Sequence, residues 1–440
     1  MASPDKDVSH SLNARYAETL AFMFRQLPMY QMVGASAYKK DLHNTLALLD
    51  FLGNPHQRLT CIHVGGTNGK GSTSHLLSAV LQAKGLKTGL FVSPHYRDFR
   101  ERIKCNGQLV GKRFVVEFIE RVRPVIETVQ PSFFELTTAM AFDYFARRKV
   151  DVAVIEVGLG GRLDSTNVIT PVLSVITNIS YDHTNILGNT LPLIATEKAG
   201  IIKANIPVVI GETHPGTAAV FQEKAAQHQA PLFFADQHYY AEIRRSDFQY
   251  STFDVYREGI LYYANLVANL SGAYQRFNLQ TVLQGVECLP PSLRPDEQAI
   301  RNGLADLKKR TAFIGRWELV QEKPRILLDS AHNEGGLKEA LEEVLRIPCQ
   351  ALHIVFGASK DKDIEHILDM LPRHARYYFA RAAIPRALDA GELAAKANAH
   401  GLKGRRYSSV KNALRAAKRR AGADDLIFVG GSIFIVAEVI

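Results

Sequence analysis

A glycine-rich segment with one lysine lies early in the chain, at Gly65-Gly66-Thr67-Asn68-Gly69-Lys70-Gly71-Ser72, directly after an apolar run. Glycines let backbone N–H groups approach phosphate oxygens, and the N-terminus of a following helix adds positive potential. Lys70 supplies a point charge, and Ser72 can face Mg²⁺. Gly71 stands where the usual phosphate loop has Ser or Thr, so the segment differs from the loop of ordinary GTPases. It predicts a polyphosphate site in preference to a ligand-free glycine turn.

Polar side chains follow three further apolar runs in the same half of the chain. Ser93 follows the run that begins at Thr88, Glu156 ends the run that begins at Val152, and His183 comes shortly after Thr177. The carboxyl ends of parallel strands meet at one edge of a sheet, where ligands bind. A carboxylate beside a phosphate loop suits Mg²⁺. We therefore expect Ser93, Glu156 and His183 to form one cluster, in preference to a surface glutamate and a structural histidine.

The segments that must position these groups alternate short apolar runs with longer helical patterns over the first 210 residues. This order is typical of parallel strands joined by right-handed crossover helices, and so of a doubly wound, mostly parallel α/β sheet. We expect strands at 60–64, 88–92, 152–157, 172–177 and 208–210, and helices at 73–84, 115–129 and 137–148.

A proline-rich stretch at 289–295 follows an irregular, aromatic-rich region at 233–263. Strand and helix patterns then resume, with strands expected at 325–328, 351–356, 377–380 and 426–429. We therefore predict two domains, a phosphate-binding domain over 1–295 with its phosphate loop at 65–72, and a smaller Rossmann-like α/β domain over 296–440.

The composition excludes several other classes of protein. The four cysteines, Cys61, Cys105, Cys288 and Cys349, stand too far apart for a zinc or redox motif, which favours the cytoplasm. No segment approaches the roughly 18 apolar residues of a membrane span. The formal net charge is +9, but the densest basic run, at 411–420, has helical apolar spacing and no aromatic residues for stacking on bases. We expect neither nucleic acid nor membrane as a partner.

The chain as a whole resembles folylpolyglutamate synthase and dihydrofolate synthase, members of the Mur ligase superfamily. Besides Gly66 to Ser72, the motifs that carry the resemblance occur in the family's order along nearly the whole sequence. They are Ser93-Pro94-His95, Glu101-Arg102-Ile103, the run from Glu156 to Asp164, Asp182-His183-Thr184, Glu197-Lys198-Ala199-Gly200-Ile201, Gly315-Arg316 and Asp329-Ser330-Ala331-His332-Asn333.

The resemblance implies roles for named residues at a site for ATP and two Mg²⁺ ions. Mg²⁺ would be bound by Ser93, Glu156, His183 and a carbamate formed from CO₂ on Lys198, a change that turns a cation into an anion. Lys70, His183 and Lys198 are the expected catalytic residues. The residues expected to bind the nucleotide are Gly66, Thr67, Asn68, Gly69, Lys70, Gly71, Ser72, Asn278, Arg316, Asp329 and His332.

The resemblance also implies a pterin site on the first domain. Its expected residues are Ser132, Phe133, Phe134, Glu135, Leu163, Asp164 and Ser165, with a looser assignment to the loop at 33–36. Aromatic rings offer a stacking face, and Glu135 could accept hydrogen bonds from an amino-pyrimidine edge. The alternative for Phe133 and Phe134 is core packing at the start of a helix.

The implied activity is an ATP-dependent amide ligase that joins L-glutamate to dihydropteroate or to reduced folates. The carboxylate would take the γ-phosphate of ATP, and glutamate would then displace phosphate from the acyl phosphate. We expect a monomer. One alternative is another Mur-type ligase, although only about 60 residues precede the phosphate strand. A second is a nucleotide-switch ATPase, against which the position of Gly71 and the second α/β domain argue.

Overall fold

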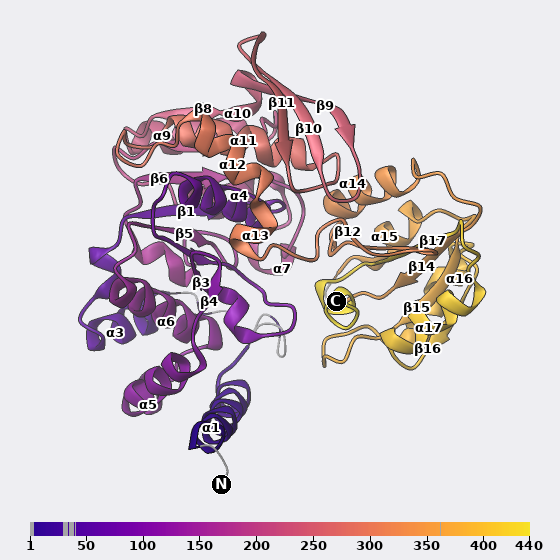
Figure 1. Cartoon of the computed structure of the whole chain (residues 1–440), viewed down its shortest axis with the longest axis horizontal. Coiled ribbons are helices and arrows are strands. Elements are labelled where there is room, and N and C mark those ends of the chain that lie inside the picture. The colour runs from indigo at the N-terminus through magenta and orange to yellow at the C-terminus, as the bar shows by residue number, and fades with distance from the viewer. Residues whose placement is uncertain (1–3, 30–33, 35–38, 40, 361) are drawn as a thin grey trace.

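A parallel-dominated sheet forms the centre of the first half of the chain (Figure 1). The computed structural model describes residues 4–29, 34, 39, 41–360 and 362–440. The strand order is β4-β3-β2-β5-β1-β6-β7-β8, and only β3 and β4 run antiparallel to their neighbours. The strands are β1 Cys61–Gly65, β2 Thr88–Phe91, β3 Ile103–Cys105, β4 Gln108–Leu109, β5 Val152–Glu156, β6 Leu173–Ile176, β7 Val208–Ile210 and β8 Leu232–Phe234.

Helices cover both faces of this sheet, as its buried apolar strands require. Two successive residues of β1 illustrate this. Ile62 faces the core beneath α4 and α11, whereas Cys61 faces the core beneath α5 and α6. The expected doubly wound fold is confirmed. The helices are α1 Pro4–Gln26, α3 His43–Phe51, α4 Lys70–Ala83, α5 Lys112–Val129, α6 Phe133–Arg148, α7 Thr184–Leu187, α8 Leu191–Ala199, α9 Ala218–Gln227, α10 Ala235–His238 and α11 Gln275–Glu287.

The aromatic-rich region folds as a separate antiparallel sheet of β9 (Tyr239–Ser246), β10 (Ser251–Arg257) and β11 (Ile260–Ala268). Our interpretation of it as irregular was wrong. In β10 alternate residues are buried, the pattern of a strand with one face on a core. Glu258 and Gly259 both have positive φ in the two-residue turn between β10 and β11, as a tight hairpin turn requires.

The second domain holds a six-stranded sheet in the order β12-β13-β17-β14-β15-β16, with β12 antiparallel to β13 and the other pairs parallel. No helix among the described residues is long and apolar enough to cross a membrane. The elements are β12 Glu318–Glu322, β13 Arg325–Leu328, α14 Glu334–Val344, β14 Leu352–Phe356, α15 Ile364–Met370, β15 Arg376–Ala380, α16 Ala390–Ala399, β16 Gly404–Tyr407, α17 Val410–Arg420, β17 Leu426–Gly430 and α18 Ile433–Ala437.

Two helices after residue 295 pack with the first sheet, namely α12 (Glu297–Ala305) and α13 (Leu307–Thr311). Gly303 of α12 lies so close to the backbone of Val80 in α4 that a Cβ there would stand 2.6 Å from the Val80 Cα. Lys104 donates from Nζ to the carbonyl oxygen of Thr311 at 2.9 Å. We therefore propose a domain boundary between α13 and β12, later than the predicted boundary after residue 295.

Candidate active site

The phosphate loop leaves β1 in a conformation that only glycine adopts without strain. Gly66 has φ +132°, and a Cβ there would stand 1.9 Å from the Thr177 Oγ1. Gly69 has φ +81°, and a Cβ there would stand 2.1 Å from the Asn278 Oδ1. Gly69 is the N-cap of α4, which starts at Lys70, earlier than the predicted Thr73. The loop is thus packed directly against the residue that follows β6 and against α11.

Polar groups after β6 hold this loop in place. The backbone N–H of Thr67 donates to the carbonyl oxygen of Asn178 at 2.9 Å, and that of Asn68 donates to the Asn178 Oδ1 at 2.9 Å. The Thr177 hydroxyl donates to the carbonyl oxygen of Asn68 at 2.5 Å. These bonds hold the backbone of the loop against the residues that follow β6.

Two lysine amines converge on the carbonyl oxygen of Gly66. Lys70 donates to it from Nζ at 3.1 Å and to the Thr67 oxygen at 2.9 Å, while Lys198 at the end of α8 donates to it at 2.7 Å. Lys198 is 4% exposed, and burial together with the charge of Lys70 lowers its pKa to about 7. A substantial share of its amine is therefore neutral near pH 7, and the neutral form is the one that reacts with CO₂.

Glu156 lies at the end of β5, beside the phosphate loop. Its Oε2 accepts a hydrogen bond from the backbone N–H of Ser93 at 2.9 Å, and burial raises its pKa to about 7 despite the nearby charge of Lys70. A Cβ at Gly71 would stand 3.7 Å from the Glu156 Oε1. Glycine at this point of the loop therefore keeps the side chain of residue 71 out of the space beside the carboxylate.

His183 is held at the N-terminus of α7 with φ +50°. Burial lowers its pKa to about 3, so the imidazole is neutral near pH 7, as a metal ligand must be. Among the described residues, no three His, Cys, Asp or Glu side chains are grouped closely enough to hold a metal ion. Glu156, a Ser93 hydroxyl and a neutral imidazole nevertheless fit Mg²⁺, which usually takes one or two carboxylates and completes its shell with phosphate and water.

The second domain reaches this site through the segment after β13. Asp329 Oδ2 accepts hydrogen bonds from the Tyr274 hydroxyl at 2.8 Å and the Trp317 N–H at 2.9 Å. Asn333 and Asn68 bond reciprocally through their side-chain amides, at 3.1 and 2.9 Å. Side chains from both domains therefore meet at the phosphate loop.

Asp182 is the charged member of this contact between the domains. It forms an ion pair with Lys362 and accepts a hydrogen bond from the Asn333 Nδ2 at 3.0 Å, and the His332 Nε2 lies 3.5 Å from its Oδ2. Although burial opposes ionisation, the partners His332 and Lys362 hold the pKa of Asp182 well below its usual range. Asp182 is thus a fixed anion between the domains.

A cavity of about 360 Å³ lies between the domains at this place. Every residue expected to bind nucleotide or metal lines it. These residues are Gly66, Thr67, Asn68, Gly69, Lys70, Gly71, Ser72, Ser93, Glu156, His183, Lys198, Asn278, Arg316, Asp329 and His332.

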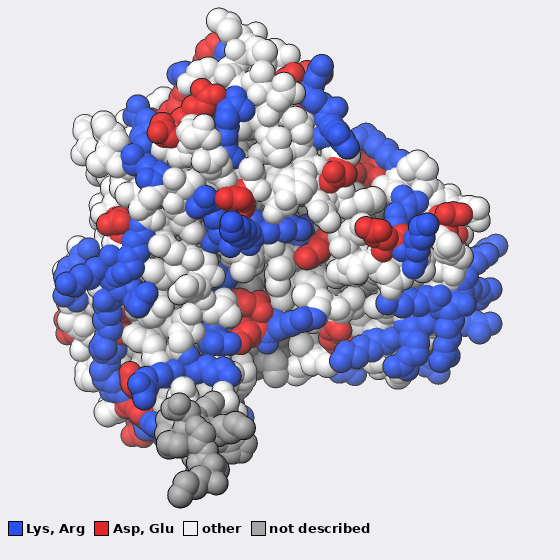
Figure 2. Space-filling view, viewed as in Figure 1, with Lys and Arg blue, Asp and Glu red and all other residues white. Residues whose placement is uncertain are grey.

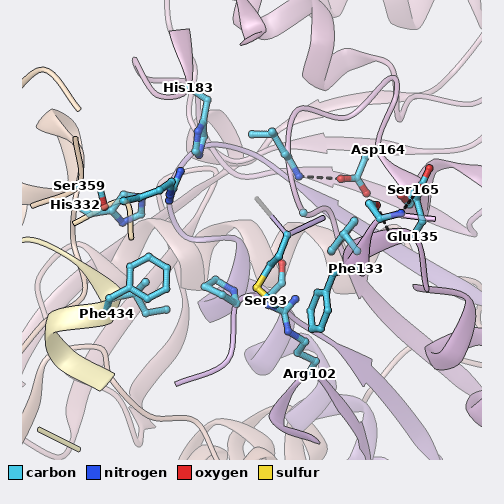
Figure 3. A pocket seen from close by; sticks show the side chains of 18 of the residues that line it. Ser93, Arg102, Phe133, Glu135, Asp164, Ser165, His183, His332, Ser359 and Phe434 are labelled. Atoms are coloured by element: carbon cyan, nitrogen blue, oxygen red, sulfur yellow. Dashed lines mark hydrogen bonds between the residues drawn. The ribbon is translucent and has the colours of Figure 1, made fainter. Parts of the chain in front are cut away.

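A second cavity, of about 220 Å³, adjoins the first and shares Ser93, His183, Arg316 and His332 with it. We call it the substrate cavity. Figure 3 shows its first-domain side chains facing His332, Ser359 and Phe434 of the second domain. The residues expected at the pterin site all line it, namely Ser132, Phe133, Phe134, Glu135, Leu163, Asp164 and Ser165.

Several of these residues also have structural tasks that the sequence interpretation missed. Ser132 and Glu135 form the capping box of α6, with the Ser132 N–H donating to the Glu135 Oε2 at 2.6 Å. The Glu135 Oε1 is buried without a hydrogen-bond partner in the described structure. Asp164 accepts from the Leu159 N–H at 2.8 Å. The spacing Ser-x-x-Glu was the signal for this cap.

The aromatic pair at the start of α6, Phe133 and Phe134, packs against neighbouring residues as well as lining the substrate cavity. Phe133 is 2% exposed and its ring lies 5.6 Å from that of Phe24. The guanidinium of Arg102 lies 5.3 Å from the centre of the Phe133 ring. Phe134 packs over Gly158, where a Cβ would stand 2.3 Å from the ring.

The proposed loop at 33–36 lies outside the described residues except for Gly34.

Further lining residues were absent from the predicted site because they carry no motif of their own. Lys362, Arg386 and Phe434 line the substrate cavity, and Tyr274 lines the larger cavity. Asp182 is the exception, since it belongs to the motif Asp182-His183-Thr184, although no role at the site was predicted for it. The others come from separate loops, and only the packing of the two domains brings them together.

Two family models match large parts of the chain. The family model described as Mur ligase middle domain matches residues 64–282, and the Mur ligase glutamate ligase domain matches residues 315–433. The chain is 35% identical to a dihydrofolate synthase/folylpolyglutamate synthase of Bacillus subtilis, covering 91% of this chain and 94% of that protein. It is 34% identical to a folylpolyglutamate synthase of Lacticaseibacillus casei, covering 96% and 97%.

Solved structures show the same similarity across both domains. The folylpolyglutamate synthase of Thermotoga maritima superposes with a TM-score of 0.79 at 33% identity, covering 97% of this chain and 96% of that one. The Escherichia coli protein FolC, solved with DHPP and ADP, gives a TM-score of 0.83 at 28% identity and 96% coverage of both chains. Another similar structure is a complex of folylpolyglutamate synthase with AMPPCP and folate, at a TM-score of 0.82.

Proposed function

The chain belongs to the folylpolyglutamate and dihydrofolate synthase family of Mur ligases, and we propose that its two cavities hold ATP and a pteroate or folate. It is an ATP-dependent ligase of folate metabolism that adds L-glutamate. Within the proposal, the substrate carboxylate takes the γ-phosphate of ATP, and the glutamate amine then displaces phosphate from the acyl phosphate. The enzyme acts as a cytoplasmic monomer.

The observation that carries the proposal is the junction of the two cavities at Ser93, His183, Arg316 and His332. One cavity is built around a phosphate loop, and the other is lined by aromatic and small polar side chains. A substrate in the second cavity would present its carboxylate to the terminal phosphate of ATP in the first. Contact between the domains keeps water from the acyl phosphate, which hydrolysis would waste.

Lys70 and Lys198 supply the main charges at this junction. Lys70 would balance the negative charge that builds up on the transferred phosphoryl group. Lys198, as a carbamate, would join Ser93, Glu156 and His183 in holding two Mg²⁺ ions. When bound, the cations withdraw charge from the phosphate oxygens. The lowered pKa of Lys198 supports the carbamate, because an ordinary protonated lysine does not react with CO₂.

The pterin end is expected to bind beside Phe133, Phe134 and Glu135. The buried, unpartnered Glu135 Oε1 supports this assignment, because a donor from an aminopyrimidine would satisfy it. Asp164 would act by holding the loop that forms the cavity wall, since both of its oxygens accept hydrogen bonds within that loop.

Substrate-dependent ATP turnover tests the proposal. ADP formation should require a pteroate or folate together with L-glutamate, and mass spectrometry of the products from dihydropteroate and from tetrahydrofolate should show which one the enzyme extends. Turnover that requires a nucleotide-linked sugar would indicate a different Mur-type ligase. Turnover that nucleic acid or a protein stimulates, and that ignores both compounds, would indicate a nucleotide switch.

A further inference from the structure

The positive charge of the chain is concentrated in one short segment. Residues 403–420 contain eight Lys or Arg and no Asp or Glu. Without those eight of the 53 basic residues, the rest of the chain holds 45 basic against 44 acidic residues and is nearly neutral. We call the eight side chains the basic edge; they are Lys403, Arg405, Arg406, Lys411, Arg415, Lys418, Arg419 and Arg420.

The fold places the basic edge on the outer strand of the second sheet and on the helix beside it. All eight residues are exposed, on or next to β16 and α17. Figure 2 shows blue side chains gathered at the lower right, over β15, β16 and α17. None of the eight forms an ion pair within the described part of the chain; Lys418 and Arg415 instead donate hydrogen bonds to Gln321 and Asn412. The surface is therefore available to an external anion.

Basic side chains also connect this surface to the substrate cavity. Arg386 and Lys362 line the cavity, and Arg386 is three residues before Asp389, which caps α16. The pKa of Asp389 lies below its usual range, chiefly because of hydrogen bonds from the Glu392 and Gly391 N–H groups and also because of the nearby charges of Arg381 and Arg406. Arg381 and Arg406 thus both lie close to Asp389, and Arg406 itself belongs to the basic edge.

The surroundings of the basic edge favour a flexible carboxylate chain over nucleic acid or membrane. The single aromatic residue within residues 403–420, Tyr407, is partly buried, and its ring lies 5.7 Å from that of Tyr378, so it is a poor platform for stacking on bases. Among the described residues of the second domain, the exposed large apolar ones are Val320 and Leu345. Neither belongs to the edge, so a membrane would find no exposed large apolar anchor among its described residues.

We propose that the basic edge binds the γ-linked glutamate tail of a long-chain folate whose pterin end occupies the substrate cavity. The inference rests on the proposed function. Each added γ-linked glutamate contributes one α-carboxylate, so the attraction to the basic edge grows with tail length and weakens with salt. A tail that runs from the cavity to the edge does not present its terminal γ-carboxylate to ATP, so the edge would set how tightly the enzyme binds long-tailed folates without touching the reacting atoms.

A variant in which four side chains of the basic edge lose their charge tests the proposed binding of the glutamate tail directly. Arg405→Gln, Arg406→Gln, Lys411→Gln and Arg415→Gln are combined in one protein. The matched control neutralises four exposed basic residues elsewhere, namely Arg113, Arg148, Arg245 and Lys309. The measurement is KM for tetrahydropteroyl mono- and pentaglutamate, or the Ki of the pentaglutamate if it is not extended. We expect the edge variant to raise the pentaglutamate constant roughly tenfold at low salt, and to leave the monoglutamate KM and kcat unchanged.

The controls separate the possible failures. Absence of monoglutamate turnover in the unmodified enzyme would refute the proposed function, whereas normal turnover with equal pentaglutamate constants in all three proteins would refute only the role of the basic edge. An equal rise in the control variant would show a general charge effect and would also refute it. Loss of binding to single-stranded RNA or to phosphatidylserine vesicles in the edge variant, with unchanged pentaglutamate constants, would assign the surface to those partners instead.

Discussion

The two sides of the larger cavity are held in different ways. On the first domain, the phosphate loop bonds to residues after β6 and packs against α11, so backbone and buried side chains of one domain fix it. The second domain reaches the loop with side chains, through the pair Asn68–Asn333 and the ion pair Asp182–Lys362. The first domain thus organises its side of the site by its own contacts, whereas the second domain contributes side chains that complete the site.

The largest effect is expected from Lys70→Ala, on the organised side. Loss of a buried charged donor aimed at the transferred phosphoryl group should lower kcat about 10²- to 10³-fold while the fold is retained. Initial rates with ATP, tetrahydrofolate and L-glutamate measure this. Lys84→Ala, at the exposed end of the same helix, is the control. An unchanged kcat would show that Lys70 has only a structural role in the loop.

Lys198→Ala is expected to reduce activity by about 10- to 100-fold, as loss of a group that positions a metal does. The carbamate assignment adds a sharper test. Because the Lys198 pKa is about 7, raising the pH through that value increases the neutral amine available to CO₂. The unmodified enzyme should lose activity in CO₂-free buffer and regain it with bicarbonate, whereas the variant should ignore bicarbonate. Full activity without CO₂ would reject the carbamate.

Glu343→Gln probes a contact between the two domains. Glu343 in α14 accepts a hydrogen bond from the Ala273 N–H, and burial raises its pKa from 4.5 to about 7. A raised carboxyl pKa contributes stability that is present below pH 4.5 and lost as the pH rises through about 7. Glutamine keeps an acceptor without a charge.

The free energy of unfolding of the Glu343→Gln variant should therefore exceed that of the unmodified protein by about 1–2 kcal/mol at pH 8, and the gain should vanish near pH 4. Denaturant unfolding at both pH values measures this. Glu334→Gln, at the start of the same helix, provides the matched variant. A gain that is equal at both pH values would show that the Glu343 charge is not its cause.

The smallest effect concerns the amide pair that joins the domains. Asn68→Ala and Asn333→Ala should each raise the KM for ATP. The loss of ATP-binding free energy in the double variant should be smaller than the sum of the losses in the two single variants. The expected coupling free energy is about 1 kcal/mol, typical of neutral hydrogen bonds. Fully additive effects would mean that this pair does not hold the second domain on the phosphate loop.

Much of the first domain was predictable because its signals are local. Buried parallel strands give continuous apolar runs, so all five strands expected before residue 211 were found with their ends shifted by at most a residue or so. Gly66 and Gly69 mark two positions of the loop at which no side chain fits. The region at 239–268 was missed because its strands are half exposed and interrupted by register shifts, which blur the alternation.

The sequence by itself determined the strand–loop–helix order, the phosphate loop, and the identity of residues such as Ser93, Glu156 and Lys198 that belong near it. Tertiary structure alone decided which groups meet them. Asp182 faces Lys362 across 180 positions of sequence, and Lys198 becomes a weak base only when packing buries it beside Lys70. Burial and docking between distant segments set those charges and contacts, and neither is a property of any single stretch of residues.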